Sequence, residues 1–151
     1  MSRRGYQACS RKSAWIAGTL FMVVLAGCEP FWKTPESRAL DFAEALVTMP
    51  PDMQKLHDIA YLAPDRNPED LLDGLSARVA LDFLRAKQTH GVALKFALGE
   101  TRHIDVLRRA VSVRVSWLQP GTPANSEVRM QIQIEKDAQG RWCITRVTGD
   151  N

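Results

Sequence analysis

Residues 111–117 read V-S-V-R-V-S-W, and residues 128–135 read V-R-M-Q-I-Q-I-E. Apolar and polar residues alternate in both stretches, which is the period of a β-strand with one buried face and one face in water. Residues 119–126 between them have the composition of a turn. Residues 137–140 (D-A-Q-G) predict a hairpin turn before a last strand that begins at Trp142. The C-terminal half is therefore predicted to be an antiparallel meander.

The same alternation begins earlier in the chain. Residues 92–98 (V-A-L-K-F-A-L) predict a first strand, and Ile104 with Val106 predicts a short second one. The apolar positions then change from even to odd residue numbers before Val111. This change requires a turn or a β-bulge near residues 108–109. The predicted sheet has about four to five strands.

The residues before the sheet have the helical period instead. Thr34 is a suitable N-cap for a helix over 35–49, which has one apolar and one polar side. A second helix is expected over 51–62. Asn67 is expected to cap a third helix, over 68–89, with proline at its first position. Three helices followed by an antiparallel meander indicate an α+β fold, with the helices packed on one face of the sheet.

The third predicted helix has apolar residues on more than one side. Leu81 and Leu84 do not belong to its main apolar stripe, so they either contact the first two helices or form a surface for a partner protein. The stripe itself has spacings of three and four residues and consists of Leu72, Leu75, Val79, Phe83 and Ala86.

The start of the chain has the pattern of an export signal. Residues 1–13 are polar and basic, and the next 14 residues carry no charge, fewer than the ~20 that a membrane-spanning helix needs. The sequence Leu25-Ala26-Gly27-Cys28 resembles the lipobox of bacterial lipoproteins. The resemblance implies that the Cys28 thiol carries a diacylglyceryl thioether, and that the chain is cut before Cys28 and acylated there. Two alternatives stay open: an ordinary thiol behind an uncleaved anchor, and cleavage after Cys28.

These patterns divide the chain into three parts. We expect a lipoprotein signal peptide over 1–27, a lipidated tether over 28–34 and a single α+β domain over 35–151. In lipoproteins of this kind an aspartate after the cysteine retains the protein at the inner membrane, and here that position is Glu29. The resemblance therefore favours the periplasmic leaflet of the outer membrane. The general export route and the twin-arginine route both stay open.

Charge and residue types exclude several functions. Residues 28–151 carry 16 basic and 17 acidic side chains, so the proposed mature chain lacks the basic excess of a nucleic-acid-binding protein. The histidines are scattered and the cysteines are unpaired, so no metal site is expected. No glycine-rich phosphate loop is present, and we expect no cofactor.

The closing hairpin, E-K-D-A-Q-G-R-W-C-I over 135–144, resembles a segment of the nuclear transport factor two-like or cystatin-like superfamily. The residues that carry the resemblance are Gly140, Trp142 and Ile144, after three leading helices and a meander. The resemblance implies a curved, cone-like domain. Superfamily members include binding modules, isomerases, dehydratases and inert scaffolds, so the fold does not choose a function.

Three functional hypotheses follow. The first is a non-catalytic binding or assembly module of the cell envelope, because the predicted inward positions of the last strands hold no acid, base or nucleophile. It implies a membrane contact through lipidated Cys28 and an envelope protein as partner. The second is a carrier of a small apolar ligand, in a cavity lined by Trp117, Met130, Ile132 and Trp142. The third is an acid–base enzyme that uses His57 and Tyr61, which lie four residues apart on one helix face.

Overall fold

The computed structural model describes residues 34–118, 121 and 125–149. The predicted signal peptide, lipobox and most of the tether therefore lie outside the described residues. Helix α2 spans Pro35–Val47, and the Thr34 side chain accepts a hydrogen bond from the backbone N–H of Ser37, which confirms the predicted N-cap. Helix α3 spans Met53–Ala60 and is capped by Asp52.

The prediction of one continuous helix over 68–89 was wrong, because this segment is divided into a short 3-10 helix, a two-residue strand and an α-helix. Asn67 caps only a short 3-10 helix, η2, over Pro68–Leu71. Strand β1 (Leu72–Asp73) follows and pairs in parallel with the end of the chain, and helix α4 then spans Leu75–Thr89. Gly74 separates β1 from α4 with φ +86°, a conformation that glycine adopts without steric cost.

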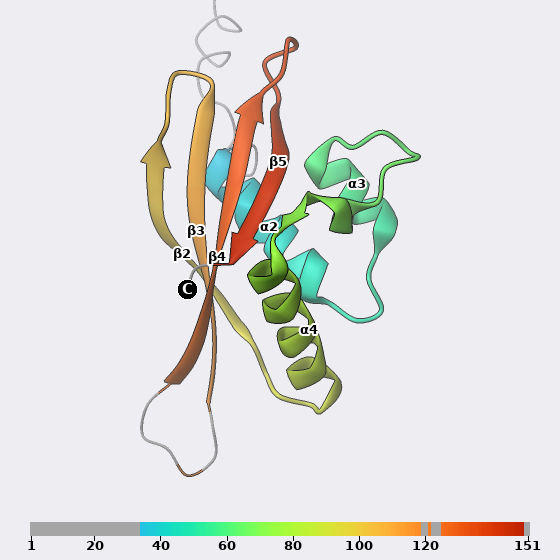
Figure 1. The fold of residues 1–151 in the computed structure, drawn as a ribbon, viewed down its shortest axis with the longest axis vertical. Helices are drawn as coiled ribbons and strands as arrows, with labels where there is room; N and C mark the ends of the chain where they lie inside the picture. Colours follow the sequence, from blue (N-terminus) through green and yellow to red (C-terminus); the bar gives the residue numbers. More distant parts are fainter. Residues whose placement is uncertain (1–33, 119–120, 122–124, 150–151) are drawn as a thin grey trace, which may run out of the picture.

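Four longer strands complete the mixed sheet, in the order β1-β5-β4-β3-β2. Consecutive strands from β2 to β5 pair antiparallel, which confirms the meander, whereas the β1–β5 pair is parallel. Figure 1 shows the helices covering one face of this sheet, so the α+β prediction is confirmed. The strands are β2 (Lys95–His103), β3 (Arg108–Leu118), β4 (Asn125–Lys136) and β5 (Trp142–Gly149).

The segment with Ile104 and Val106 is a turn and not the predicted second strand. Strand β2 extends through His103, and residues 104–107 connect it to β3 as a hairpin. The predicted interruption near 108–109 is this turn. A register shift also occurs within β2, between Leu98 and Thr101. Local alternation was misleading here because both apolar side chains face solvent.

The hydrophobic core lies between the helices and the inner face of the sheet. Buried residues of α2 and α4 meet alternating residues of the long strands, as the two periodicities predict. Burial of this apolar surface is the main stabilising contribution to the fold. The largest fully buried side chains include Phe42, Leu46, Leu56, Leu81, Leu84, Met130, Ile132, Ile134 and Ile144.

Helix α4 buries a different side from the stripe that its sequence suggests. Ala77, Leu81 and Leu84 are buried in the core. Leu75, Val79 and Phe83 are exposed, and we call these three residues the α4 strip. Pairing of β1 with β5 and the break at Gly74 set how α4 begins, and helical periodicity alone does not contain this information. No helix of the described ranges is long and apolar enough to cross a membrane.

Candidate functional site

Helix α3 carries both candidate acid–base residues. His57 lies within the helix, and Tyr61 ends it with its backbone N–H donating to the carbonyl oxygen of His57. Tyr61 has φ +53° and ψ +41°, the left-handed conformation that a bulky side chain rarely adopts. Such a backbone persists only where the surrounding contacts hold it.

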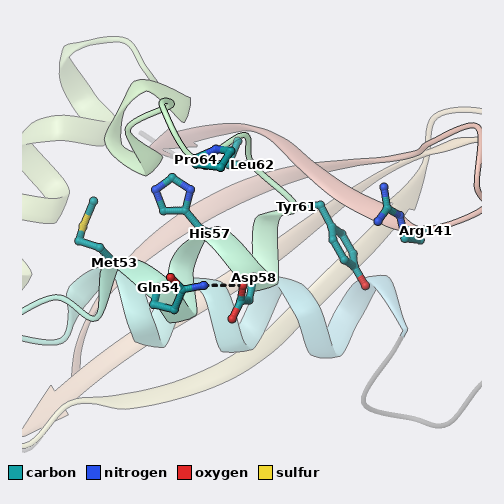
Figure 2. Close-up of a pocket in the computed structure, with 8 residues that line it drawn as sticks. All are labelled: Met53, Gln54, His57, Asp58, Tyr61, Leu62, Pro64 and Arg141. Atoms are coloured by element: carbon teal, nitrogen blue, oxygen red, sulfur yellow. Dashed lines mark hydrogen bonds between the residues drawn. The ribbon is translucent and has the colours of Figure 1, made fainter.

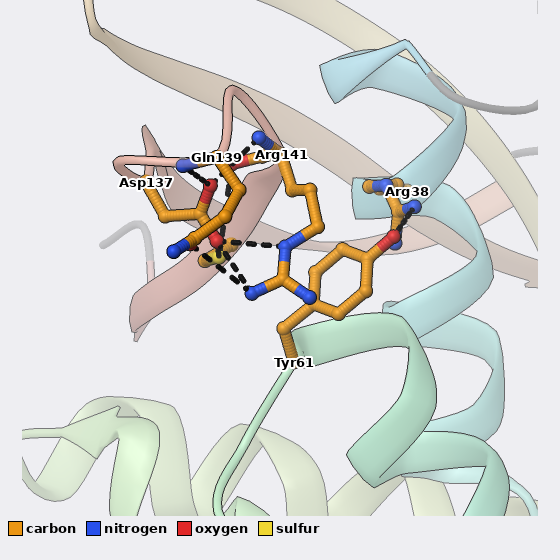
Figure 3. Close-up of polar contacts among 6 residues, drawn as sticks. Arg38, Tyr61, Asp137, Gln139 and Arg141 are labelled. Atoms are coloured by element: carbon orange, nitrogen blue, oxygen red, sulfur yellow. Dashed lines mark hydrogen bonds and ion pairs between the residues drawn. The ribbon is translucent and has the colours of Figure 1, made fainter.

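Two arginines hold the Tyr61 side chain (Figure 3). Arg38, in the first turn of α2, donates from Nη2 to the phenol oxygen over 2.6 Å and from Nη1 to the carbonyl oxygen of Ile59 over 3.0 Å. Its guanidinium carbon lies 4.4 Å from the centre of the Tyr61 ring, and that of Arg141 lies 4.6 Å from it. Cation–π contacts of this kind stabilise the ring in place. They join α2, α3 and the β4–β5 hairpin.

Asp137 fixes Arg141 in turn. The Asp137 carboxylate accepts from the Arg141 side chain over 2.8 Å and from the backbone N–H groups of Gln139 and Arg141. Desolvation acts to raise the pKa of Asp137, but these hydrogen bonds outweigh it and lower the pKa below its ordinary value. Burial and the neighbouring Asp137 charge raise the pKa of the half-buried Cys143 thiol, which therefore is not an activated nucleophile.

A pocket of about 670 Å³ lies beside α3 (Figure 2). This volume is within the usual range for small-molecule sites. The Nδ1 atom of His57 is buried, and no described residue hydrogen-bonds to it. Gln54 donates to Asp58 over 3.0 Å at the pocket wall. The lining residues are Met53, Gln54, His57, Asp58, Tyr61, Leu62, Pro64 and Arg141.

The structure brings His57 and Tyr61 to one pocket, but they do not converge on a single point. In Figure 2 the Tyr61 hydroxyl points away from the His57 ring. That hydroxyl accepts its hydrogen bond from Arg38. The pocket can therefore supply an imidazole, the Asp58 carboxylate and the Arg141 guanidinium to a bound molecule. The arginine partners of Tyr61 were not predicted, because an arginine on the polar side of a helix has no sequence signal for a specific contact.

The predicted ligand-cavity residues lie in the core. Met130 and Ile132 are 1% and 0% exposed and belong to the hydrophobic core. Trp117 contacts Phe83 edge to face with ring centres 5.4 Å apart, and the cations of Arg109 on β3 and Lys136 on β4 lie over the Trp142 ring. None of these four residues lines the pocket beside α3. They are packing residues of the sheet, and Cys28 lies outside the described ranges.

No group of metal-ligating side chains that could hold an ion occurs among residues 34–118, 121 and 125–149.

Comparison with known proteins finds similarity only at the level of three-dimensional structure. No family model and no curated protein matches the chain. A nuclear transport factor two-like protein of unknown function from Shewanella oneidensis is 15% identical, with 78% of this chain and 100% of that one covered and a TM-score of 0.41. A ketosteroid isomerase-like protein from Erwinia carotovora is 15% identical, with 77% and 93% covered and a TM-score of 0.40. These values concern the arrangement of helices and strands and do not extend to an activity.

Proposed function

We propose that this protein is a lipid-anchored lipoprotein of the bacterial envelope whose folded domain is a non-catalytic binding or assembly module facing the periplasm. The observation that carries the proposal is the sequence Leu25-Ala26-Gly27-Cys28 behind a basic start and a short uncharged run. Two or more acyl chains attach a protein stably to a bilayer, whereas one chain gives only marginal binding. The outer membrane remains the favoured location, because Glu29 replaces the aspartate of the retention signal.

The length of the tether supports a role close to the membrane. Six residue steps separate Cys28 from Thr34, the cap of α2, and they span at most about 20 Å when fully extended. A domain on such a tether stays within roughly its own diameter of the lipid surface. It can therefore meet membrane-bound partners without diffusing through the periplasm.

The α4 strip supports a binding role. Leu75, Val79 and Phe83 are exposed at four-residue spacing along the helix. A groove of about 510 Å³ adjoins Val79 and Phe83 and extends to Val128 on β4. Contiguous exposed apolar surface with a polar rim is typical of protein interaction sites. This surface is the best candidate for the envelope partner.

Fatty-acid labelling tests the anchor. Bacteria that express the chain and are fed an alkyne analogue of palmitate should label the wild type and the Cys143→Ser variant equally. The Cys28→Ser variant should carry no label and should accumulate as the longer precursor. Equal labelling of Cys28→Ser and the wild type would remove the proposal, because acylation would then not depend on Cys28.

Acid–base catalysis at the α3 pocket is the second candidate function. It is favoured by His57 and Asp58, which both line a pocket of small-molecule size. Proton transfer by a positioned histidine is a common catalytic step. The test compares the turnover of a panel of small carbonyl compounds by the wild type, His57→Ala and the control variant Gln54→Ala. Turnover by His57→Ala at the wild-type rate would eliminate this candidate. A loss of turnover in His57→Ala but not in Gln54→Ala would favour it.

A further inference from the structure

The start of α2 and two β-hairpins lie at one end of the molecule (Figure 1). Arg38 in the first turn of α2 reaches Tyr61, which in turn contacts Arg141 of the β4–β5 hairpin. The backbone N–H of Lys136, at the end of β4, donates over 2.8 Å to the carbonyl oxygen of Leu107 in the β2–β3 turn. The tether from a lipid anchor on Cys28 joins the domain at the start of α2. A short tether therefore holds this end of the molecule toward the bilayer.

The β2–β3 turn at this end exposes apolar side chains. Ile104, Val106 and Leu107 are 42%, 84% and 51% exposed, and we call them the hairpin tip. Three exposed aliphatic side chains in one four-residue turn are unfavourable in water, because the transfer of each side chain out of water would lower the free energy. They do not pack against the described core.

Basic side chains flank the hairpin tip. Residues 102–109 contain three arginines and one acidic residue, Asp105. Arg108 pairs with Asp105 over 2.6 Å, which neutralises the acid, and Arg102 is exposed. An apolar tip with surrounding arginines matches the bilayer interface, where aliphatic groups enter the acyl boundary and cations meet anionic headgroups.

The backbone of the turn is largely hydrogen-bonded within the protein. Asp105 accepts from the backbone N–H groups of Leu107 and Arg108, and the N–H of Ile104 donates to the Arg108 carbonyl oxygen. Backbone groups without partners are costly in a lipid environment. This turn can enter the interface without exposing those groups to hydrocarbon.

We infer that the hairpin tip inserts into the headgroup layer of an anionic phospholipid bilayer and forms a second membrane contact beside the lipid anchor. The inference rests on the proposed anchor for its orientation. Two contacts at the same end fix how the domain stands on the membrane. The α4 strip then lies to the side of the domain, where a neighbouring envelope protein can reach it.

Site-specific photo-cross-linking tests this contact. The photoreactive residue p-benzoylphenylalanine replaces Val106 in one variant and Leu118 in the other. Leu118 is a matched control, because it is exposed and apolar but ends β3 at the opposite end from the hairpin tip. The full chain, with the processing it received in the bacterium, is reconstituted into vesicles of phosphatidylethanolamine and phosphatidylglycerol. Intact mass after irradiation identifies both the adducts and any acyl chains on Cys28.

The inference predicts phospholipid adducts at position 106 and none above background at position 118, with fewer at position 106 in vesicles of phosphatidylcholine alone. A vesicle-bound chain without lipid adducts at position 106 would overturn the inference while leaving an acylated Cys28 in place. The inference would also be overturned by equal adducts at both positions, by protein adducts as the main product at position 106, or by a chain that does not bind the vesicles. Adducts at 106 on a chain without acyl groups would support the inference and remove the proposed anchor.

Discussion

The guanidinium of Arg38 donates a hydrogen bond of 2.6 Å to the phenol oxygen of Tyr61, which joins the first turn of α2 to the end of α3. The contact holds a residue whose backbone lies in the left-handed region. It also commits the Tyr61 hydroxyl to the protein's own structure. Tyr61 lines the α3 pocket, so the hydrogen bond from Arg38 fixes one residue of the pocket wall and also contributes to the stability of the domain.

Removal of this hydrogen bond should destabilise the domain. The Tyr61→Phe variant keeps the ring contacts but loses the phenol oxygen, and we expect its free energy of unfolding to fall by about 1 kcal/mol, because a partly exposed charged hydrogen bond is worth about that much. Urea denaturation measures the change. In an Arg38→Ala background the same substitution should have almost no effect. An equal loss in both backgrounds would show that the two residues are not coupled.

The two sides of α4 should respond differently to the same truncation. Leu84 is 0% exposed and Leu75 is 78% exposed. Leu84→Ala should lower the free energy of unfolding by about 2–5 kcal/mol, since it leaves a cavity in the core. Leu75→Ala should change it by less than about 0.5 kcal/mol. If Leu75→Ala destabilised the domain more than Leu84→Ala in thermal or urea unfolding, the apolar stripe predicted from the sequence, and not Leu84, would face the core.

Acid should weaken the β4–β5 hairpin through Asp137. Its pKa is lowered in the folded state, so the folded protein binds the proton less readily than the unfolded chain. The stabilisation is present above the unfolded pKa and is lost as the pH falls through the folded pKa, that is, below about pH 4. The stability difference between the wild type and Asp137→Asn should therefore shrink as the pH falls from neutral to acid.

Asp65 provides the control for that measurement. It lies exposed in the loop after α3, and its carboxylate forms no ion pair within the described residues. Asp65→Asn should match the wild type at neutral pH and in acid. A stability difference for Asp137→Asn that stays constant with pH would contradict the assigned role of the carboxylate.

The local sequence predicted those elements whose periodicity and caps agree. Thr34, Pro35 and the apolar side of residues 35–49 all indicate α2, and the alternation over 111–117 and 128–135 indicates β3 and β4. Asn67 does cap a helix, as its position before a proline predicts, but that helix is only a short 3-10 helix. The chain then leaves the helix because Leu72 pairs with Val147, 75 residues later, and no local pattern records that pairing.

The candidate site was predicted in part for a similar reason. The spacing of His57 and Tyr61 placed both on one side of α3, and both line one pocket. The direction of the Tyr61 hydroxyl depends on Arg38, from another helix, so it could not be read from α3 alone. The alternation of Ile104 with Val106 predicted a strand, although these residues face solvent in a turn. Their exposure indicates a membrane contact only once the structure places the start of α2 at the same end of the molecule.

The intact mass of the chain purified from a bacterial membrane tests the central claim most directly. The proposed function predicts a polypeptide that begins at Cys28 and carries the added mass of a diacylglyceryl group and an amide-linked acyl chain. A chain that begins at any other residue, or that begins at Cys28 without added lipid, would contradict it.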